Sequence, residues 1–215
     1  MGISKYQIGS SFISISLLTL SLAPSAQALT FKTFTNIDAF QAATTRLNIE
    51  TFNSTATSTD KNHDLTDFNI RSDMTWTRIS EGTLTGNINN TNFLQLQSRN
   101  PATSAALNFY SSMSAIGFDW VNTDNSGDTL ELIIDGQSEI FGAANQKGFF
   151  GIIALDGLFD SVEFSDTEGG GYLQYAGIDN IRYGYVQDVP TPTAILPSLF
   201  GIFVGLGRRK QTEQP

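Results

Sequence analysis

The chain has no cysteine and only one histidine, His63, among its 215 residues. Without cysteine it can form no disulfide, no thiolate metal site and no cysteine nucleophile. One histidine is too few for a typical zinc site, and Ser-His-Asp catalysis would have to use His63, yet no nucleophile elbow occurs. Phosphate-binding and dinucleotide-binding glycine motifs are also missing. The sequence therefore favours a protein that is not an enzyme.

Basic residues are scarce as well, with 12 Lys and Arg against 21 Asp and Glu. The segment 29–188 holds 8 of the basic and 20 of the acidic residues, which gives it a net charge of −12. Its second half, 109–188, has 2 basic and 13 acidic residues. Such a surface argues against nucleic acid as a partner and favours cations, although negative charge also serves solubility alone.

The N-terminal segment 1–28 has the pattern of a secretory signal peptide. Lys5 precedes an apolar run over 12–22, and Ala26-Gln27-Ala28 follows as a small-x-small cleavage site. We therefore expect export and cleavage after Ala28. The alternative is a membrane anchor, for which the serines and threonines of the apolar run are unfavourable.

The C-terminal segment 189–215 consists of a proline-spaced linker, an apolar run and a basic cluster. The linker is Val189 to Thr193, the 14 residues 194–207 carry no charge, and Arg208, Arg209 and Lys210 follow. A helix of that length reaches about 21 Å, less than the ~30 Å of a bilayer core. This suits a temporary membrane segment with its cations on the cytoplasmic side. The alternative is a terminal core helix, which the glycines of the run disfavour.

This layout resembles the PEP-CTERM sorting signal of bacterial surface and matrix proteins. In that family a membrane-embedded protease or transpeptidase, the exosortase, is thought to recognise and remove the tail. The usual motif is Val-Pro-Glu-Pro; here Val189, Pro190 and Pro192 match it, and Thr191 replaces the glutamate, as in a Pro-Thr-Pro variant. The resemblance implies sorting to the cell envelope or extracellular matrix, membrane contact through the tail before processing, and an exosortase-like enzyme as partner.

The 160 residues 29–188 are enough for one domain with a hydrophobic core. Asn36 is placed to cap a helix that should end near Arg46, with Ile37 and Phe40 on one face. Residues 53–64 predict an exposed loop, and Asp135-Gly136 predicts a turn. Short alternating or apolar segments predict strands at 48–52, around Leu84, and at 93–96, 106–110, 116–120, 130–134, 149–155, 162–164 and 172–185. This pattern predicts an all-β fold, an antiparallel β-sandwich with one short N-terminal helix.

The last predicted strand carries a second resemblance. Residues 175–183, Y-A-G-I-D-N-I-R-Y, are similar to the closing strand of carbohydrate-binding jelly-roll modules, where Ile-Asp-(Asn or Asp)-(Ile or Val) recurs. In several of these modules the aspartate ligates a structural calcium together with an acidic residue of an early strand. The resemblance implies a jelly-roll-like sandwich, with Asp179 and Glu50 as calcium ligands.

Physical chemistry leaves the role of Asp179 open. A carboxylate on an otherwise apolar strand should be hydrogen-bonded, paired or metal-bound, so pairing with Arg182 or with backbone N–H groups is the alternative to calcium. Ile178 and Ile181 have opposite parity, which predicts a β-bulge between them. A second acidic cluster, 124–128, fits a hairpin turn better than a calcium loop.

Exposed aromatic side chains could stack on sugar rings. Trp76 and Tyr172 lie beside predicted loops and are the candidate ligand-binding residues, whereas Trp120 shares a face with Phe118 and is expected in the core. Paired carboxylates for glycoside cleavage cannot be selected from 20 candidates.

The sequence thus predicts an exported, non-enzymatic envelope or matrix protein that associates with extracellular polysaccharide. One alternative is a structural or adhesive matrix protein, bridged by cations and without a sugar site. A polysaccharide hydrolase is the other alternative.

Overall fold

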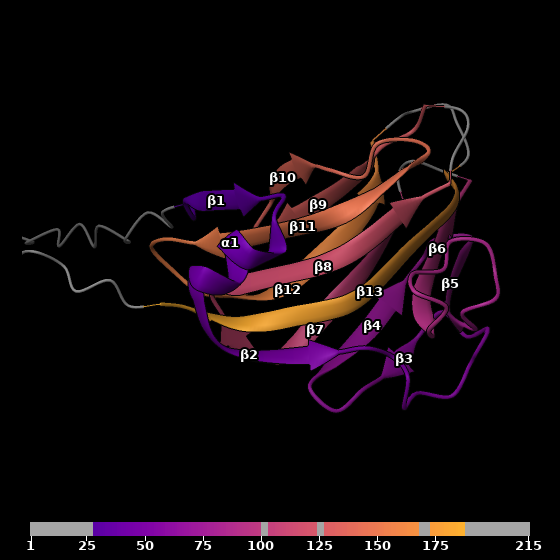
Figure 1. The fold of residues 1–215 in the computed structure, drawn as a ribbon, viewed down its shortest axis with the longest axis horizontal. Coiled ribbons are helices and arrows are strands. Elements are labelled where there is room, and N and C mark those ends of the chain that lie inside the picture. The colour runs from indigo at the N-terminus through magenta and orange to yellow at the C-terminus, as the bar shows by residue number, and fades with distance from the viewer. Residues whose placement is uncertain (1–27, 100–102, 124–126, 168–172, 188–215) are drawn as a thin grey trace, which may run out of the picture.

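The computed structural model describes residues 28–99, 103–123, 127–167 and 173–187 (Figure 1). The predicted sorting tail, Tyr172 and most of the predicted signal peptide lie outside this part of the chain.

The described residues fold into two stacked antiparallel sheets, which confirms the predicted β-sandwich (Figure 1). The first sheet has the order β1 (Phe31–Phe34), β11 (Gln146–Ala154), β8 (Ala115–Asn122), β13 (Leu173–Val186), β6 (Phe93–Ser98) and β5 (Trp76–Ser80), and β2 (Thr44–Glu50) pairs with β13. The second sheet has the order β10 (Gln137–Ile140), β9 (Leu130–Ile134), β12 (Phe159–Asp166), β7 (Ser104–Met113), β4 (Phe68–Ser72) and β3 (His63–Asp64).

Side chains that alternate along the strands fill the space between the sheets. Phe118 of β8 contacts Phe164 of β12 edge-on, with ring centroids 5.1 Å apart. Trp120 belongs to the same core and is only 9% exposed, as predicted. Residues 150–154 of β11 are all buried, so this strand is covered on both faces as its apolar sequence indicated.

The only helix of the described residues, α1 (Ile37–Ala42), lies on the outer face of the first sheet (Figure 1). Asn36 caps it by accepting a hydrogen bond from the Ala39 N–H. Phe40 packs into a small second cluster with Phe34, Ala115 and Ile153. The helix ends before the predicted Arg46, because the β-branched pair that begins at Thr44 already enters β2 and pairs with Val186.

Residues 81–92 cross the outer face of the first sheet as a loop, so the predicted strand around Leu84 is wrong. The Gln95 side-chain amide donates to the Thr85 carbonyl, and Gly86 packs directly on Gly177 of β13. A Cβ on Gly177 would lie 1.8 Å from the Gly86 oxygen, so only glycine allows this contact. Strands β4 and β5, which the sequence analysis did not predict, precede this loop.

Two local predictions are confirmed. Asp135 and Gly136 form the β9–β10 turn with φ values of 51° and 72°. The pairing of β13 with β8 shifts register between Asp179 and Arg182, which is the predicted bulge. No helix among the described residues has the length and apolar character needed to cross a bilayer.

Candidate functional site

The outer face of the first sheet is the surface on which the candidate residues meet. Strand register aligns Lys147, Val121, Gly177, Gln95 and Arg78 in one row across five strands. The neighbouring positions Ile178, Leu94 and Ile79 point into the core. Since side chains alternate between faces, this row and the parallel rows two residues away point outward.

One end of this face carries two aromatic rings. Trp76 of β5 is 44% exposed, and its ring centroid lies 6.5 Å from that of Tyr175 on β13. The Arg78 guanidinium lies 5.1 Å from the Trp76 ring, and its Nε donates to Gln95 Oε1. We call Trp76 and Tyr175 the aromatic pair. Its rings present a partly exposed apolar surface held by neighbouring polar side chains.

Gln97 of β6 lies between the two strands that carry the aromatic pair. It is directly opposite Trp76, and on its other side β13 bulges between Leu173 and Ala176, beside Tyr175. Gln97 is 7% exposed, and its Oε1 has no hydrogen-bond partner in the described part of the chain. A buried acceptor without a donor is unfavourable, and because this oxygen is enclosed we expect an ordered water, not a polymer, to donate to it.

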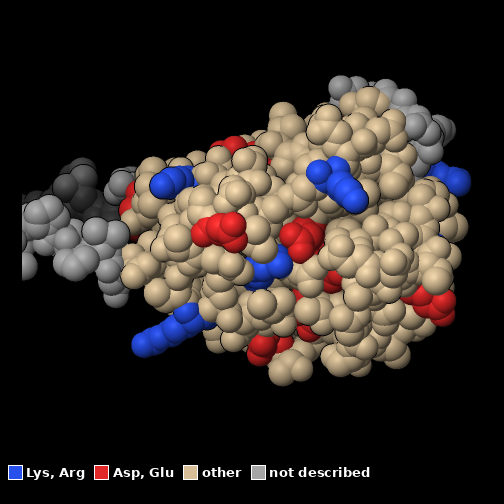
Figure 2. Space-filling view, in the orientation of Figure 1, with Lys and Arg blue, Asp and Glu red and all other residues tan. Residues whose placement is uncertain are grey.

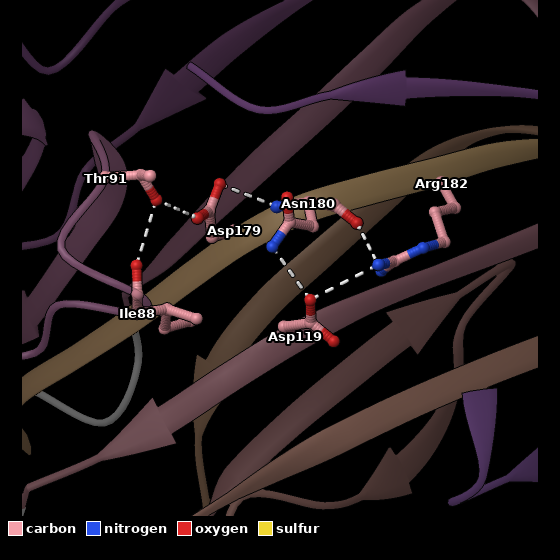
Figure 3. A network of polar contacts seen from close by, with 6 residues as sticks. All are labelled: Ile88, Thr91, Asp119, Asp179, Asn180 and Arg182. Atoms are coloured by element: carbon pink, nitrogen blue, oxygen red, sulfur yellow. Dashed lines mark hydrogen bonds and ion pairs between the residues drawn. The ribbon is translucent and has the colours of Figure 1, made fainter. Parts of the chain in front are cut away.

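A polar network lies on the same face, further along β13 (Figure 3). Asp119 of β8 accepts hydrogen bonds from the Asn180 side-chain amide at 2.8 Å and from Arg182 Nη2 at 3.3 Å. Arg182 also donates to the Asn180 carbonyl at 2.7 Å, and its guanidinium lies 5.7 Å from the Phe149 ring. Arg182 therefore pairs with Asp119. The sequence-based alternative, in which Arg182 pairs with Asp179, is wrong.

Asp179 is fully buried beneath the loop 81–92 and accepts the Asn180 backbone N–H at 2.7 Å. The Thr91 hydroxyl lies 2.9 Å from both Asp179 Oδ2 and the Ile88 carbonyl (Figure 3). A hydroxyl has one proton, so it can donate to only one of these acceptors. Both contacts are hydrogen bonds at once when Asp179 is protonated and donates to the Thr91 oxygen.

Burial is the main cause that raises the pKa of Asp179 to about 6, and repulsion from the Asp119 carboxylate adds to it. The hydrogen bonds from Asn180 and Thr91 and the charge of Arg182 act in the opposite direction. Burial outweighs these opposing contributions, so the pKa of Asp179 is raised overall. Because it is fully buried, Asp179 cannot touch a polymer.

The structure does not join the two predicted calcium ligands through any hydrogen bond. Glu50 Oε1 accepts the Phe52 backbone N–H at 2.5 Å, and Glu50 pairs in register with Ile181. Among the described residues, no group of three or more acidic or histidine side chains is placed to hold a metal ion. Calcium binds oxygen ligands, and oxygens do surround Asp179. Most of them are neutral hydroxyl and carbonyl oxygens and not carboxylates.

A groove of about 630 Å³ lies beside this network. Its lining comes from the loop 81–92, β8 and β11, and consists of Asn87, Ile88, Asn89, Asn90, Asp119, Trp120, Lys147 and Gly148. We call it the polar groove. Asn89 and Asn90 have φ values of 57° and 58°, a left-handed conformation that asparagine tolerates better than most residues.

Of the candidate ligand-binding residues, Trp76 is exposed on the outer face and Tyr172 lies outside the described residues. Gln97, Asp119 and the asparagines of the polar groove were not predicted. Nothing in the sequence distinguishes their side chains. Strand register and the packing of the loop 81–92 on β13 bring them to one surface.

No protein-family model and no curated protein sequence matches the chain. Among solved structures, the catalytic domain of a GH87 alpha-1,3-glucanase in complex with tetrasaccharides aligns with 13% identity and a TM-score of 0.38, over 68% of this chain and 30% of that one. The K2 cleaved adhesin domain of Lys-gingipain aligns with 15% identity and a TM-score of 0.39, over 64% and 99%.

The catalytic unit of a thermostable GH87 alpha-1,3-glucanase from Streptomyces thermodiastaticus aligns with 10% identity and a TM-score of 0.36, over 68% and 28%. The chain thus spans less than a third of the glucanases with which it overlaps. Similarities of this size carry no argument about function.

Proposed function

We propose that this is an exported, non-enzymatic protein of the cell envelope or extracellular matrix that associates with polysaccharide through the aromatic pair. The observation that carries the proposal is the partly exposed Trp76 ring beside Tyr175, on the outer face of the first sheet. The apolar faces of sugar rings pack on such aromatic rings. No catalytic role is assigned to any side chain.

Export rests on the two terminal segments of the sequence. The signal-peptide-like residues 1–28 and the tail that resembles a PEP-CTERM signal support delivery across the membrane. In this proposal the tail, with Val189-Pro190-Thr191-Pro192 and the cations Arg208 to Lys210, holds the protein at the membrane until an exosortase-like enzyme processes it.

The fold is compatible with such a tether. Phe31 pairs with Ala154, and Val186 pairs with Thr44, so the chain enters and leaves the first sheet at the same end. Tyr175 lies near the other end of β13, and the 11 residues from there to Val186 span about 36 Å if extended. A tether after Val186 would leave the aromatic pair facing away from the membrane.

Residues 29–188 are the unit to test, because both hydrophobic clusters of the described residues fall within them. Cooperative thermal unfolding verifies that this unit is folded. The assay measures its retention on isolated extracellular polysaccharide, first with calcium and then with chelator. We expect saturable retention that a particular sugar blocks, with no release of soluble product.

Trp76→Ala should lower the affinity at least roughly tenfold. The matched control is Tyr110→Ala, because Tyr110 is 59% exposed and lies on β7 of the second sheet. Equal loss in both variants, or no retention of the unchanged protein, contradicts the proposal. Calcium-dependent self-association without sugar selectivity would instead support the cation-bridged matrix protein.

A further inference from the structure

We propose that the polar groove is a second glycan-binding site, selective for uncharged, hydroxyl-rich polysaccharide. This inference rests on the proposed function, which it extends by a site and by the charge class of the ligand.

The groove presents side chains that can bind hydroxyl groups. Asn89 and Asn90 are exposed, and neither side chain has a hydrogen bond within the described residues. Lys147 is exposed on the opposite wall and takes part in neither of the two ion pairs of this part of the chain. Amides donate and accept, ammonium donates, and the Asp119 carboxylate accepts, which is the mixture that adjacent hydroxyls require.

The loop that carries the asparagines is held in place before any ligand binds. Gly86 packs on Gly177, Gln95 donates to the Thr85 carbonyl, and Thr91 contacts the buried Asp179. A loop fixed on a rigid sheet keeps its side chains in one arrangement, so little conformational entropy is lost on binding. The left-handed backbone at Asn89 and Asn90 fits a loop shaped for a role other than stability.

Charge decides which polysaccharide fits. Lys147 and Arg182 are the only basic residues of 109–188, and both lie on this face. Arg182 is neutralised by Asp119 at 3.3 Å, and the groove lining itself holds one cation and one anion. Figure 2 shows Lys and Arg scattered among Asp and Glu on this face, without a patch of one sign. The domain charge of −12 repels an acidic polymer, whereas an uncharged one is unaffected.

The test uses residues 29–188 and extracellular polysaccharide separated by anion exchange into uncharged and acidic fractions. We expect the uncharged fraction to bind, with an affinity that changes little between low and high salt. The double variant Asn89→Gly/Asn90→Gly should lower this affinity roughly tenfold. Glycine removes the amides and accepts the left-handed backbone, so the loop keeps its shape.

Asp135→Gly is the matched control, since Asp135 has the same backbone conformation, with φ 51°, in a turn of the second sheet. Lys147→Gln should change binding of the uncharged fraction only slightly, because a donor remains. Binding of the acidic fraction alone, with strong loss in Lys147→Gln, overturns the charge class. Loss in Trp76→Ala but not in the double asparagine variant overturns the groove and leaves the aromatic pair in place. If the unchanged protein binds neither fraction, both proposals fail.

Discussion

Asp179 and Asp119 lie directly opposite each other on β13 and β8, yet only Asp179 is fully buried. Asp119 keeps some exposure and holds the charged Arg182, whereas Asp179 lies under a loop with a hydroxyl and a backbone N–H as partners. The two carboxylates therefore have different surroundings, and burial raises the pKa of Asp179. The raised pKa of Asp179 gives the molecule a pH dependence that can be measured.

The first prediction concerns the pH dependence of stability. The pKa of Asp179 is about 6 in the folded chain against 3.8 ordinarily, so between these values the folded state keeps a proton that the unfolded state releases. The proton on Asp179 therefore stabilises the folded state fully below pH 4. As the pH rises through 6, this contribution is lost and the free energy of unfolding falls by about 3 kcal/mol. Asp179→Asn should remove this fall and be more stable than the wild type at pH 7, by about 1–3 kcal/mol.

Asparagine can accept from the Asn180 N–H and donate to Thr91, as the protonated acid does. Urea unfolding of both proteins between pH 4 and pH 8 measures the effect. Comparing the two proteins cancels the titration of other groups, such as Asp156, whose pKa is lowered by its hydrogen bonds to Thr30. A difference between the proteins that does not change with pH contradicts the prediction.

A second prediction separates calcium binding from simple burial. If calcium binds at Asp179, the carboxylate must be ionised. The charge of the metal then lowers the pKa of Asp179, which burial alone raises. Calcium should then raise the melting temperature of the wild type, and Asp179→Asn should abolish the rise and become the less stable protein in calcium. Glu50→Gln should abolish the rise as well if both residues hold the same ion. Scanning calorimetry with calcium and with chelator distinguishes these cases by the sign of the change.

A third prediction concerns the ion pair of Asp119 and Arg182. The Arg182 side chain is only 10% exposed, so loss of its partner leaves a largely buried charge. Asp119→Ala should cost about 2–4 kcal/mol of stability. Asp119→Asn keeps an oxygen acceptor for Arg182 or Asn180 and should cost less than half as much. Denaturant unfolding at pH 7 measures both, and a negligible cost of Asp119→Ala would contradict the prediction.

How far the sequence predicts this fold depends on how local each feature is. The alternation of Ile116, Phe118 and Trp120 predicted β8 and its buried face, and Asp135-Gly136 predicted a hairpin turn, because both signals lie within a few residues. Strands β4 and β5 were missed. Their stability comes from pairing with β7 and β6, which neighbouring residues do not reveal.

The candidate site is less predictable than the fold for the same reason. Trp76 could be selected as an exposed aromatic, but its neighbours Gln97 and Tyr175 come from two other strands, 21 and 99 residues further along the sequence. The polar groove requires the loop 81–92 to fold over β13. That contact depends on two glycines whose meeting the sequence does not indicate.

The fourth prediction tests that contact. Gly177→Ala places a Cβ 1.8 Å from the Gly86 oxygen, a backbone atom that cannot move without the loop. We expect a loss of about 1–3 kcal/mol in stability and displacement of the loop 81–92 from the sheet. Displacement also separates Thr91 from Asp179, so the buried carboxyl should become accessible and lose much of its raised pKa. Hydrogen exchange of the amides in residues 83–92 measures the displacement.

The matched control is Gly148→Ala, because a Cβ there would lie 3.4 Å from the nearest Trp120 atom, an ordinary contact. It adds the same methyl group to another strand of the first sheet, on the face that carries Trp120, and should cost little stability. If Gly177→Ala leaves both the stability and the exchange of the loop unchanged, the loop is not held by this contact. The polar groove would then lack the rigid wall on which its binding depends.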